Sequence, residues 1–255
     1  RAAGPHRRAA PWPARRTWCC GSACASRNRI PQSAFFERFG SRGVAVLEKA
    51  VAEARAAGAL VLMDAKRGDI GSTMAAYAQT YLDKDSPLFS DALTVSPYLG
   101  FGSLRPALDA ARVSGSGLFV LALTSNPEGA EVQRSTTADG RSLAQLMLDH
   151  MAVENSGATP LGSVGAVVGA TLGEAGVDLG INGPLLAPGI GAQGATPADL
   201  PGVFGAAVAN VVPSVSRGVL RHGPDVYALR AAAERFNDEA RTAVEGAAES
   251  ADGAR

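Results

Sequence analysis

Short apolar runs alternate with amphipathic helical stretches along almost the whole chain from residue 31 onward. Six runs read as buried strands: 59–64, 92–95, 117–123, 164–169, 184–187 and 211–214. Helical composition occupies the intervals and the end of the chain, at 44–57, 72–82, 104–113, 142–154 and 226–247. Runs without polar alternation are typical of strands covered on both faces. The alternation therefore predicts a parallel α/β sheet with right-handed crossovers.

The number of strands favours a barrel. An α/β barrel needs about 250 residues, and the chain has 255. Six strands and a damaged seventh before Pro31 are one or two short of eight. We expect a (β/α)8 TIM barrel whose first strand is missing or degenerate and whose second is damaged. The expected division is an atypical leader at 1–29 and a barrel domain at 30–255.

The leader differs in composition from the rest of the chain. It holds seven Arg, no Lys, Asp or Glu, both Trp and all three Cys. An organelle transit peptide, a nucleic-acid-binding arm and a coding sequence read out of frame would each give an Arg-rich, acid-free segment. The third reading is favoured, because the segment has no hydrophobic periodicity, so no nucleic-acid partner is expected. Cys19, Cys20, Cys24 and His6 lack the spacing of a metal site.

Residues 30–255 contain no cysteine, which fits a reducing compartment, and we expect the cytoplasm. The chain has no run of 18 apolar residues, so we expect no membrane span.

A charged cluster follows the first apolar run. Asp64 and Lys66 lie two residues apart at its end, so their side chains share one face, about 6–7 Å apart along the backbone. Gly68 then turns the chain and Asp69 follows. Barrels carry their chemistry at the carboxyl ends of their strands. The alternative is a structural ion pair, with Asp69 capping the next helix.

A glycine-rich segment follows the fifth run. Gly189, Gly191 and Gly194 satisfy G-x-G-x-x-G, but the motif lies late in the chain and 196–197 is Thr-Pro. Dinucleotide binding needs a helix directly after the motif, so the context is wrong. The glycines can instead offer backbone N–H groups to a phosphate, with Gln193 as a donor and Arg217, after the last strand, as a cationic partner. The alternative is a plain turn and a solvated arginine.

Three segments together resemble orotidine 5′-phosphate decarboxylase, in particular its actinobacterial branch. They are Asp-Ala-Lys-Arg-Gly-Asp-Ile-Gly-Ser-Thr at 64–73, Pro-Tyr-Leu-Gly at 97–100 and Thr-Ser-Asn-Pro at 124–127. The resemblance covers about residues 31–247. It implies a homodimeric (β/α)8 barrel with shared active sites that converts orotidine 5′-phosphate to UMP and CO2 in pyrimidine synthesis, without cofactor or metal.

The resemblance also implies roles for individual residues. Lys66 would donate the proton to C6 of the pyrimidine, and Asp64 would face the carboxyl group of the substrate. Three residues would reach into the partner's site: Asp69, Ile70 and Thr73. Three others would bind the substrate: Ser125 at the pyrimidine ring, Gln193 and Arg217 at the phosphate. The chemistry agrees, because loss of CO2 leaves a carbanion that needs a nearby cation and a proton.

The chain departs from the family pattern at its start. The family has a first strand ending in a ribose-binding aspartate and a second ending in Lys-Pro-Gln. Here Ile30 precedes Pro31 and Gln32, and nothing in 1–29 resembles the first strand. Two alternatives follow: a non-catalytic relic of the same fold, or a Mg²⁺-dependent sugar-phosphate decarboxylase or aldolase of the same barrel type.

Overall fold

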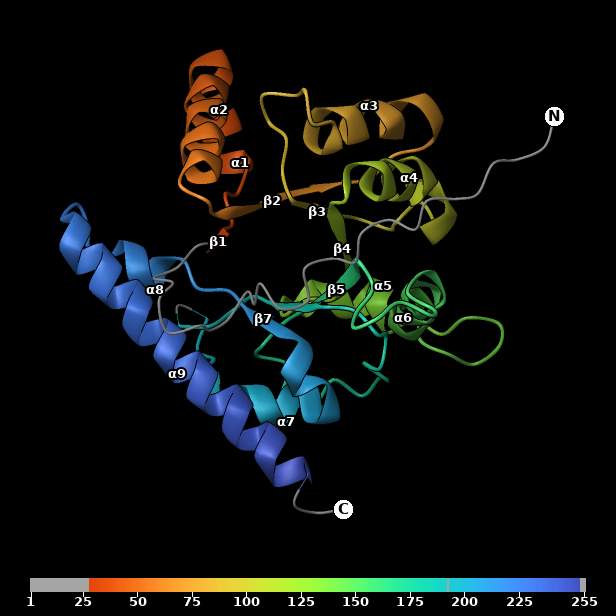
Figure 1. Cartoon of the computed structure of the whole chain (residues 1–255). Coiled ribbons are helices and arrows are strands. Elements are labelled where there is room, and N and C mark those ends of the chain that lie inside the picture. Colours follow the sequence, from red (N-terminus) through yellow and green to blue (C-terminus); the bar gives the residue numbers. More distant parts are fainter. Residues whose placement is uncertain (1–27, 192, 253–255) are drawn as a thin grey trace.

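The computed structural model describes residues 28–191 and 193–252, and its centre is one parallel sheet (Figure 1). Seven strands follow each other across the sheet in the order of the sequence. They are β1 (Asn28–Arg29), β2 (Leu60–Arg67), β3 (Ala92–Val95), β4 (Gly117–Leu123), β5 (Val164–Val168), β6 (Leu185–Ala187) and β7 (Val211–Pro213). The predicted parallel α/β architecture is confirmed.

Helices connect the strands, as the periodicity predicts. The long ones are α2 (Gly40–Ala56), α3 (Gly71–Leu82), α4 (Arg105–Ser114), α6 (Leu143–Glu154) and α9 (Val226–Asp252). Short ones are α1 (Ala34–Glu37), α5 (Ala130–Gln133), α7 (Leu200–Phe204), α8 (Arg217–Leu220) and four 3-10 helices at Phe101–Leu104, Pro127–Gly129, Pro197–Asp199 and Gly205–Asn210. In Figure 1, α2, α3 and α4 lie beside the first strands, and α9 runs past α7 and α8.

Two apolar clusters hold the sheet. The larger one packs the outer faces of the strands against the helices, and its fully buried members include Leu47 of α2, Met74 of α3 and Leu108 of α4. The smaller one takes one residue from each strand between β2 and β7: Leu62, Ala92, Phe119, Val167, Leu186 and Val212. Each of these six side chains is 5% exposed or less. They line the inner face of a curved sheet, as expected for barrel strands.

The sheet begins with a very short strand. Asn28 and Arg29 pair in parallel with Leu60 and Val61 of β2, and a bridge joins Gln32 to Asp64. Within the described residues the pairing runs from β1 to β7 and does not join those two ends. The expected loss of a first strand concerns residues 1–27 and falls outside the described part. No helix in the described part is long and apolar enough to cross a membrane.

Candidate active site

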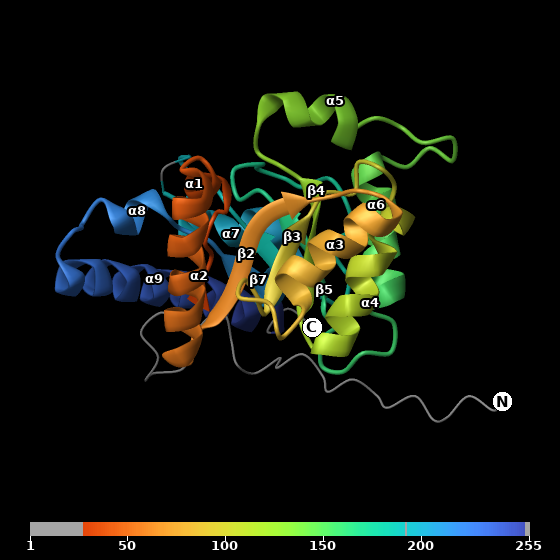
Figure 2. The same ribbon diagram turned by 90° about the horizontal axis from the view of Figure 1, so that it is seen from above.

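The residues singled out in the sequence lie at the carboxyl ends of the strands or in the segments that follow them. Asp64 and Lys66 are among the last four residues of β2, and Ser125 follows β4. Gln193 follows β6, and Arg217 begins α8 directly after β7. The carboxyl ends of parallel strands meet at one edge of a sheet, and α5 lies beyond that edge, apart from the other helices (Figure 2).

Asp64 is the centre of a hydrogen-bonded array. Its Oδ1 accepts hydrogen bonds from Lys66 Nζ at 2.6 Å and from Thr94 Oγ1 at 2.8 Å. Its Oδ2 accepts from Lys66 Nζ at 2.7 Å and from Gln32 Nε2 at 2.8 Å. The side chain of Asp64 is 20% exposed and that of Lys66 43%. The carboxylate is therefore fixed on both oxygens, while the ammonium group stays accessible to a ligand.

The backbone at Lys66 is unusual. Its φ is +48°, in the left-handed region that non-glycine residues rarely adopt, and the pairing of β2 with β3 shifts register between Met63 and Arg67. Such a conformation costs on the order of 1–3 kcal/mol and persists where the surroundings enforce it. Here Thr94 Oγ1 accepts the Lys66 N–H at 2.9 Å. A Cβ on Gly68 would lie 2.4 Å from Ser96 O, so glycine lets the turn approach β3.

The segment after this turn leads into α3. Asp69 Oδ1 accepts the N–H of Ile70 at 2.8 Å, and Ile70, not Asp69, occupies the N-cap position without a side-chain cap. The alternative role of Asp69 as the helix cap is thus wrong. Ile70 is 62% exposed, and Thr73 in the first turn of α3 is also exposed. Among the described residues, no hydrogen bond joins Asp69 to Asp64 or Lys66.

A second pair joins the segments after β4 and β6. Ser125 Oγ donates to Gln193 Oε1 at 3.0 Å. The chain at Gly189 and Gly191 has φ values of +107° and +80°, which favour glycine, and Gly191 N donates to Ala195 O at 2.7 Å. This makes a tight loop with exposed backbone in front of a 3-10 helix. The helix that dinucleotide binding requires directly after the motif is absent from this described segment.

Arg217 lies on the next segment of the same edge. Its side chain is exposed, and within the described part it forms no hydrogen bond or ion pair with the other predicted site residues. An exposed guanidinium is suited to an anionic group, which it can bind through two parallel hydrogen bonds.

No group of three or more His, Cys, Asp and Glu side chains able to hold a metal ion occurs among the described residues.

Comparison with protein families places the chain. The model of the orotidine 5′-phosphate decarboxylase / HUMPS family matches residues 31–232. The chain belongs to this family. It is 78% identical over 215 residues to the orotidine 5′-phosphate decarboxylase of Streptomyces coelicolor, a match that covers 84% of this chain and 77% of the relative. For the orotidine 5′-phosphate decarboxylase of Salinispora arenicola the identity is 64% over 217 residues, covering 85% and 78%.

Solved structures agree with this assignment. A crystal structure from Streptomyces avermitilis aligns with a TM-score of 0.84 and 77% identity, covering 86% of this chain and 77% of that one. The structure of Leishmania donovani OMP decarboxylase aligns with a TM-score of 0.65 and 31% identity, covering 84% and 80%. The fold and the family are thus shown together.

Ile30 follows β1 directly. Its side chain is partly buried and packs against the inner cluster of the sheet. Gln32 donates a hydrogen bond to Asp64, so the segment after β1 contributes to the array.

Several residues of the candidate site were not found from the sequence. Thr94 is 1% exposed and binds both Asp64 and the Lys66 backbone, yet in the sequence it is only a polar residue inside an apolar run. A buried hydroxyl at a strand end is a pattern that could have indicated it. Gln133 lies on α5 and binds Thr124, next to Ser125. Only the fold brings that pair together.

Arg67 fastens the reactive strand to two helices. Its guanidinium forms an ion pair with Glu37 of α1, lies 3.3 Å from the hydroxyl of Tyr81 and 5.4 Å from the ring centre of Tyr77, both on α3. Burial lowers the pKa of Arg67, but the bonds and charges of Tyr81 and Glu37 outweigh it, so the pKa lies above its usual value. Arg67 thus links the end of β2 to α1 and α3.

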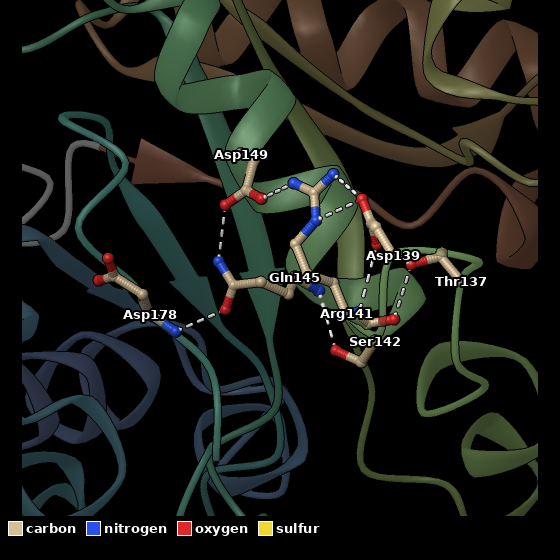
Figure 3. Close-up of polar contacts among 7 residues, drawn as sticks. All are labelled: Thr137, Asp139, Arg141, Ser142, Gln145, Asp149 and Asp178. Atoms are coloured by element: carbon tan, nitrogen blue, oxygen red, sulfur yellow. Dashed lines mark hydrogen bonds and ion pairs between the residues drawn. The ribbon is translucent and has the colours of Figure 1, made fainter.

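The long segment between β4 and α6 is fastened by a second arginine (Figure 3). Arg141 Nε donates to Asp139 Oδ2 at 3.0 Å, and the guanidinium also pairs with Asp149 of α6. Gln145 bridges Asp149 Oδ1, at 2.8 Å, and the backbone N–H of Asp178, at 2.8 Å. The hydrogen bonds of Arg141 hold the pKa of Asp139 well below its usual value. The network ties the segments after β4 and β5 to one helix.

Proposed function

We propose that this protein decarboxylates orotidine 5′-phosphate to UMP and CO2 in de novo pyrimidine synthesis. The observation that carries the proposal is the Asp64–Lys66 pair, fixed at the end of β2 by Thr94 and Gln32, in a member of the orotidine 5′-phosphate decarboxylase family.

In the proposed reaction the bond between C6 and the carboxyl carbon breaks, CO2 leaves, and the electron pair stays on C6. Lys66 Nζ, an exposed cation 2.6 Å from Asp64, then gives C6 its proton. The cation stabilises the developing carbanion before the proton moves. Asp64 faces the departing carboxylate, and its bonds to Thr94 and Gln32 keep it from turning away.

Binding is assigned to the later strands. Ser125 contacts the pyrimidine ring, and Gln193 and Arg217 hold the phosphate beside the glycine loop. The Ser125–Gln193 hydrogen bond supports this, because it brings the ring-binding and phosphate-binding segments within contact of each other. Phosphate binding far from C6 can be used to hold the ring in a reactive geometry.

The active form is proposed to be a homodimer with shared sites. Asp69, Ile70 and Thr73 of the partner subunit complete each site. Exposed apolar side chains at Ile70 (62%), Tyr98 (76%) and Leu99 (53%), on the segments after β2 and β3, support an interface there. Single exposed apolar residues are common, but a group on adjoining segments favours a contact surface.

No cofactor or metal is part of the proposal, and the proposed location is the cytoplasm. Membership of the family, with relatives named as orotidine 5′-phosphate decarboxylases, disfavours both the relic and the Mg²⁺-dependent enzyme. The test is consumption of orotidine 5′-phosphate with and without EDTA. Loss of activity in EDTA would support the metal-dependent alternative.

The start of the chain is the weak point for activity. We propose that residues 1–29 stand in place of the family's first strand, its ribose-binding aspartate and the lysine of the second strand. Ile30 cannot supply the missing cation, so Lys66 is left as the lysine paired with Asp64. Eight-stranded closure would then need a strand between β7 and β1. Reading the coding DNA upstream of Ile30 in all frames tests this proposal directly.

A further inference from the structure

Two hydrogen bonds from the side-chain amide of Gln133 hold Thr124, the residue before Ser125, and are called the clamp below. Gln133 Oε1 accepts the backbone N–H of Thr124 at 2.8 Å, and Gln133 Nε2 donates to Thr124 Oγ1 at 2.7 Å. Thr124 Oγ1 in turn donates to Asn126 Oδ1 at 2.6 Å. One amide thus fixes both the backbone and the hydroxyl of Thr124, and a partner on the other side of Ser125 is bound to the same hydroxyl.

Two glycines leave room for this arrangement. A Cβ on Gly129 would lie 2.8 Å from Thr124 Oγ1 and 3.1 Å from both polar atoms of the Gln133 amide. On the opposite side, a Cβ on Gly169 would lie 3.0 Å from Ser125 N and 3.1 Å from Ser125 Cβ. Real Cβ atoms rarely approach other atoms so closely, because interiors are packed to contact. Ser125 is therefore confined between the clamp and the end of β5.

The segment that carries the clamp is itself held at its far end. Chain between β4 and α6 leaves the body of the molecule at α5 (Figure 2) and returns through Arg141, whose bonds to Asp139 and Asp149 fasten it to α6. Gln133 lies between the end of β4 and Arg141 in the sequence. Its amide is the polar link from α5 back to the end of β4, so α5 and Thr124 hold each other in place.

We propose that Gln133 is a positioning residue that sets the binding geometry of Ser125 and so the preference for ligands with a pyrimidine ring. This inference rests on the proposed contact of Ser125 with the ring. Gln133 itself touches no ligand. The phosphate is assigned to Gln193 and Arg217 on other segments, and of these Gln193 is hydrogen-bonded to Ser125. Loss of the clamp should therefore affect ring recognition most and phosphate binding much less.

The test compares two probes on the full chain by titration calorimetry: UMP, which carries the ring, and ribose 5-phosphate, which lacks it. Gln133→Ala removes both clamp bonds and is expected to weaken UMP binding about tenfold, the effect of losing roughly 1.4 kcal/mol of orientation. Ribose 5-phosphate binding should stay within about twofold. Gln133→Glu keeps the acceptor for the Thr124 N–H but not the donor. Its UMP affinity should lie between those of the unchanged chain and Gln133→Ala.

Matched controls separate positioning from general damage. Glu131→Ala changes an exposed residue of the same helix and should leave both affinities unchanged. Gly129→Ala inserts a methyl group against the clamp from another direction and should reproduce the loss of UMP binding alone. A purely structural role would lower the melting temperature and weaken both probes equally, which would overturn the inference.

Ser125→Ala separates failure of this inference from failure of the proposed function. If Ser125→Ala weakens UMP binding and Gln133→Ala does not, the positioning role is wrong and the ring contact stands. If neither change affects UMP binding, or the unchanged chain binds no UMP, the assigned ring contact fails and the inference fails with it.

Discussion

Lys66 combines an accessible ammonium group with a backbone conformation that few lysines adopt. Its φ of +48° is maintained by the Thr94 hydroxyl, and its side chain is held by Asp64. A strained backbone at a strand end is typical of residues placed for chemistry. An exposed ion pair contributes at most about 1 kcal/mol, which would not offset the cost of this backbone conformation, about 1–3 kcal/mol. The conformation therefore favours the catalytic reading of Lys66 over the structural one.

We expect Lys66→Ala, made in a chain that carries the family's first two strands in place of residues 1–29, to abolish decarboxylation and leave phosphate binding nearly intact. The reason is that the change removes the proton donor but nothing on the segments after β6 and β7. Turnover and UMP affinity are measured side by side. Retention of more than a few per cent of turnover, as an order of magnitude, would exclude Lys66 as the donor.

Arg217 offers a second test at the level of single residues. Because its exposed side chain is assigned to the phosphate, Arg217→Ala should weaken binding of a phosphorylated ligand by about 2–3 kcal/mol, the loss of a charged hydrogen-bonding partner. Its effect on orotidine, which lacks the phosphate, should be much smaller. Equal losses on both ligands would assign Arg217 a structural role. Arg230→Ala, an exposed arginine of α9, is the control.

At the level of elements, α4 and α6 are joined by a carboxylate. Glu154, whose side chain is 11% exposed, accepts from Arg105 at 2.5 Å and also pairs with Arg112. Arg105 above all, and then Arg112, lower the pKa of Glu154 below its usual 4.5, although burial alone would raise it. A lowered folded-state pKa means that the stabilisation is complete above pH ~4.5 and is lost as the pH falls through the folded value.

We expect Glu154→Gln to lower the free energy of unfolding by about 1 kcal/mol at pH 7, since the two arginines are half-exposed and solvent screens the pairs. The difference from the unchanged chain should shrink as the pH is lowered below ~4.5. Urea unfolding at pH 7, 5 and 4 measures it. Glu53→Gln, in an exposed pair with Lys49, is the control and should change little at any pH. A difference that grows at low pH would contradict this assignment.

The elements were largely predictable from the sequence because their signals are local. Runs such as 117–123 and 92–95 coincide with β4 and β3, and the helical composition at 72–82 differs from α3 by one residue. Within the site, the Asp64–Lys66 pair was predicted because side chains two apart on a strand share a face. The left-handed backbone at Lys66 and the Gln133 clamp were not, because contacts between distant segments determine both.

At the level of the whole molecule, the two ends of the described sheet are short strands. The described pairing starts at β1, of two residues, and stops at β7, of three. Exposed strand edges favour aggregation, and a barrel removes them only when its first and last strands pair. We therefore expect the activity of the chain to depend on what occupies the positions before Pro31.

The chain with residues 1–29 as given should be inactive or nearly so, whereas a version with the family's first two strands should be active. A missing cation leaves Asp64 with one lysine, and the loss of a charged hydrogen-bonding partner costs about 1.5–3 kcal/mol. A comparable loss in the transition state slows turnover by roughly 10- to 150-fold. Both versions are compared by consumption of orotidine 5′-phosphate at equal folded concentration. Similar rates would show that the leader supplies both missing groups.

The sequential order of the strands divides the labour of the molecule along the chain. The groups assigned to bond breaking, Asp64 and Lys66 with Thr94 behind them, all precede residue 96, and those assigned to ring and phosphate all follow residue 123. A bound nucleotide would therefore be bound at its phosphate and ring by the later part of the chain, whereas the earlier part would supply the groups that act at C6. Because such a ligand binds only the folded chain, it would raise the free energy of unfolding of the sheet for as long as it is bound.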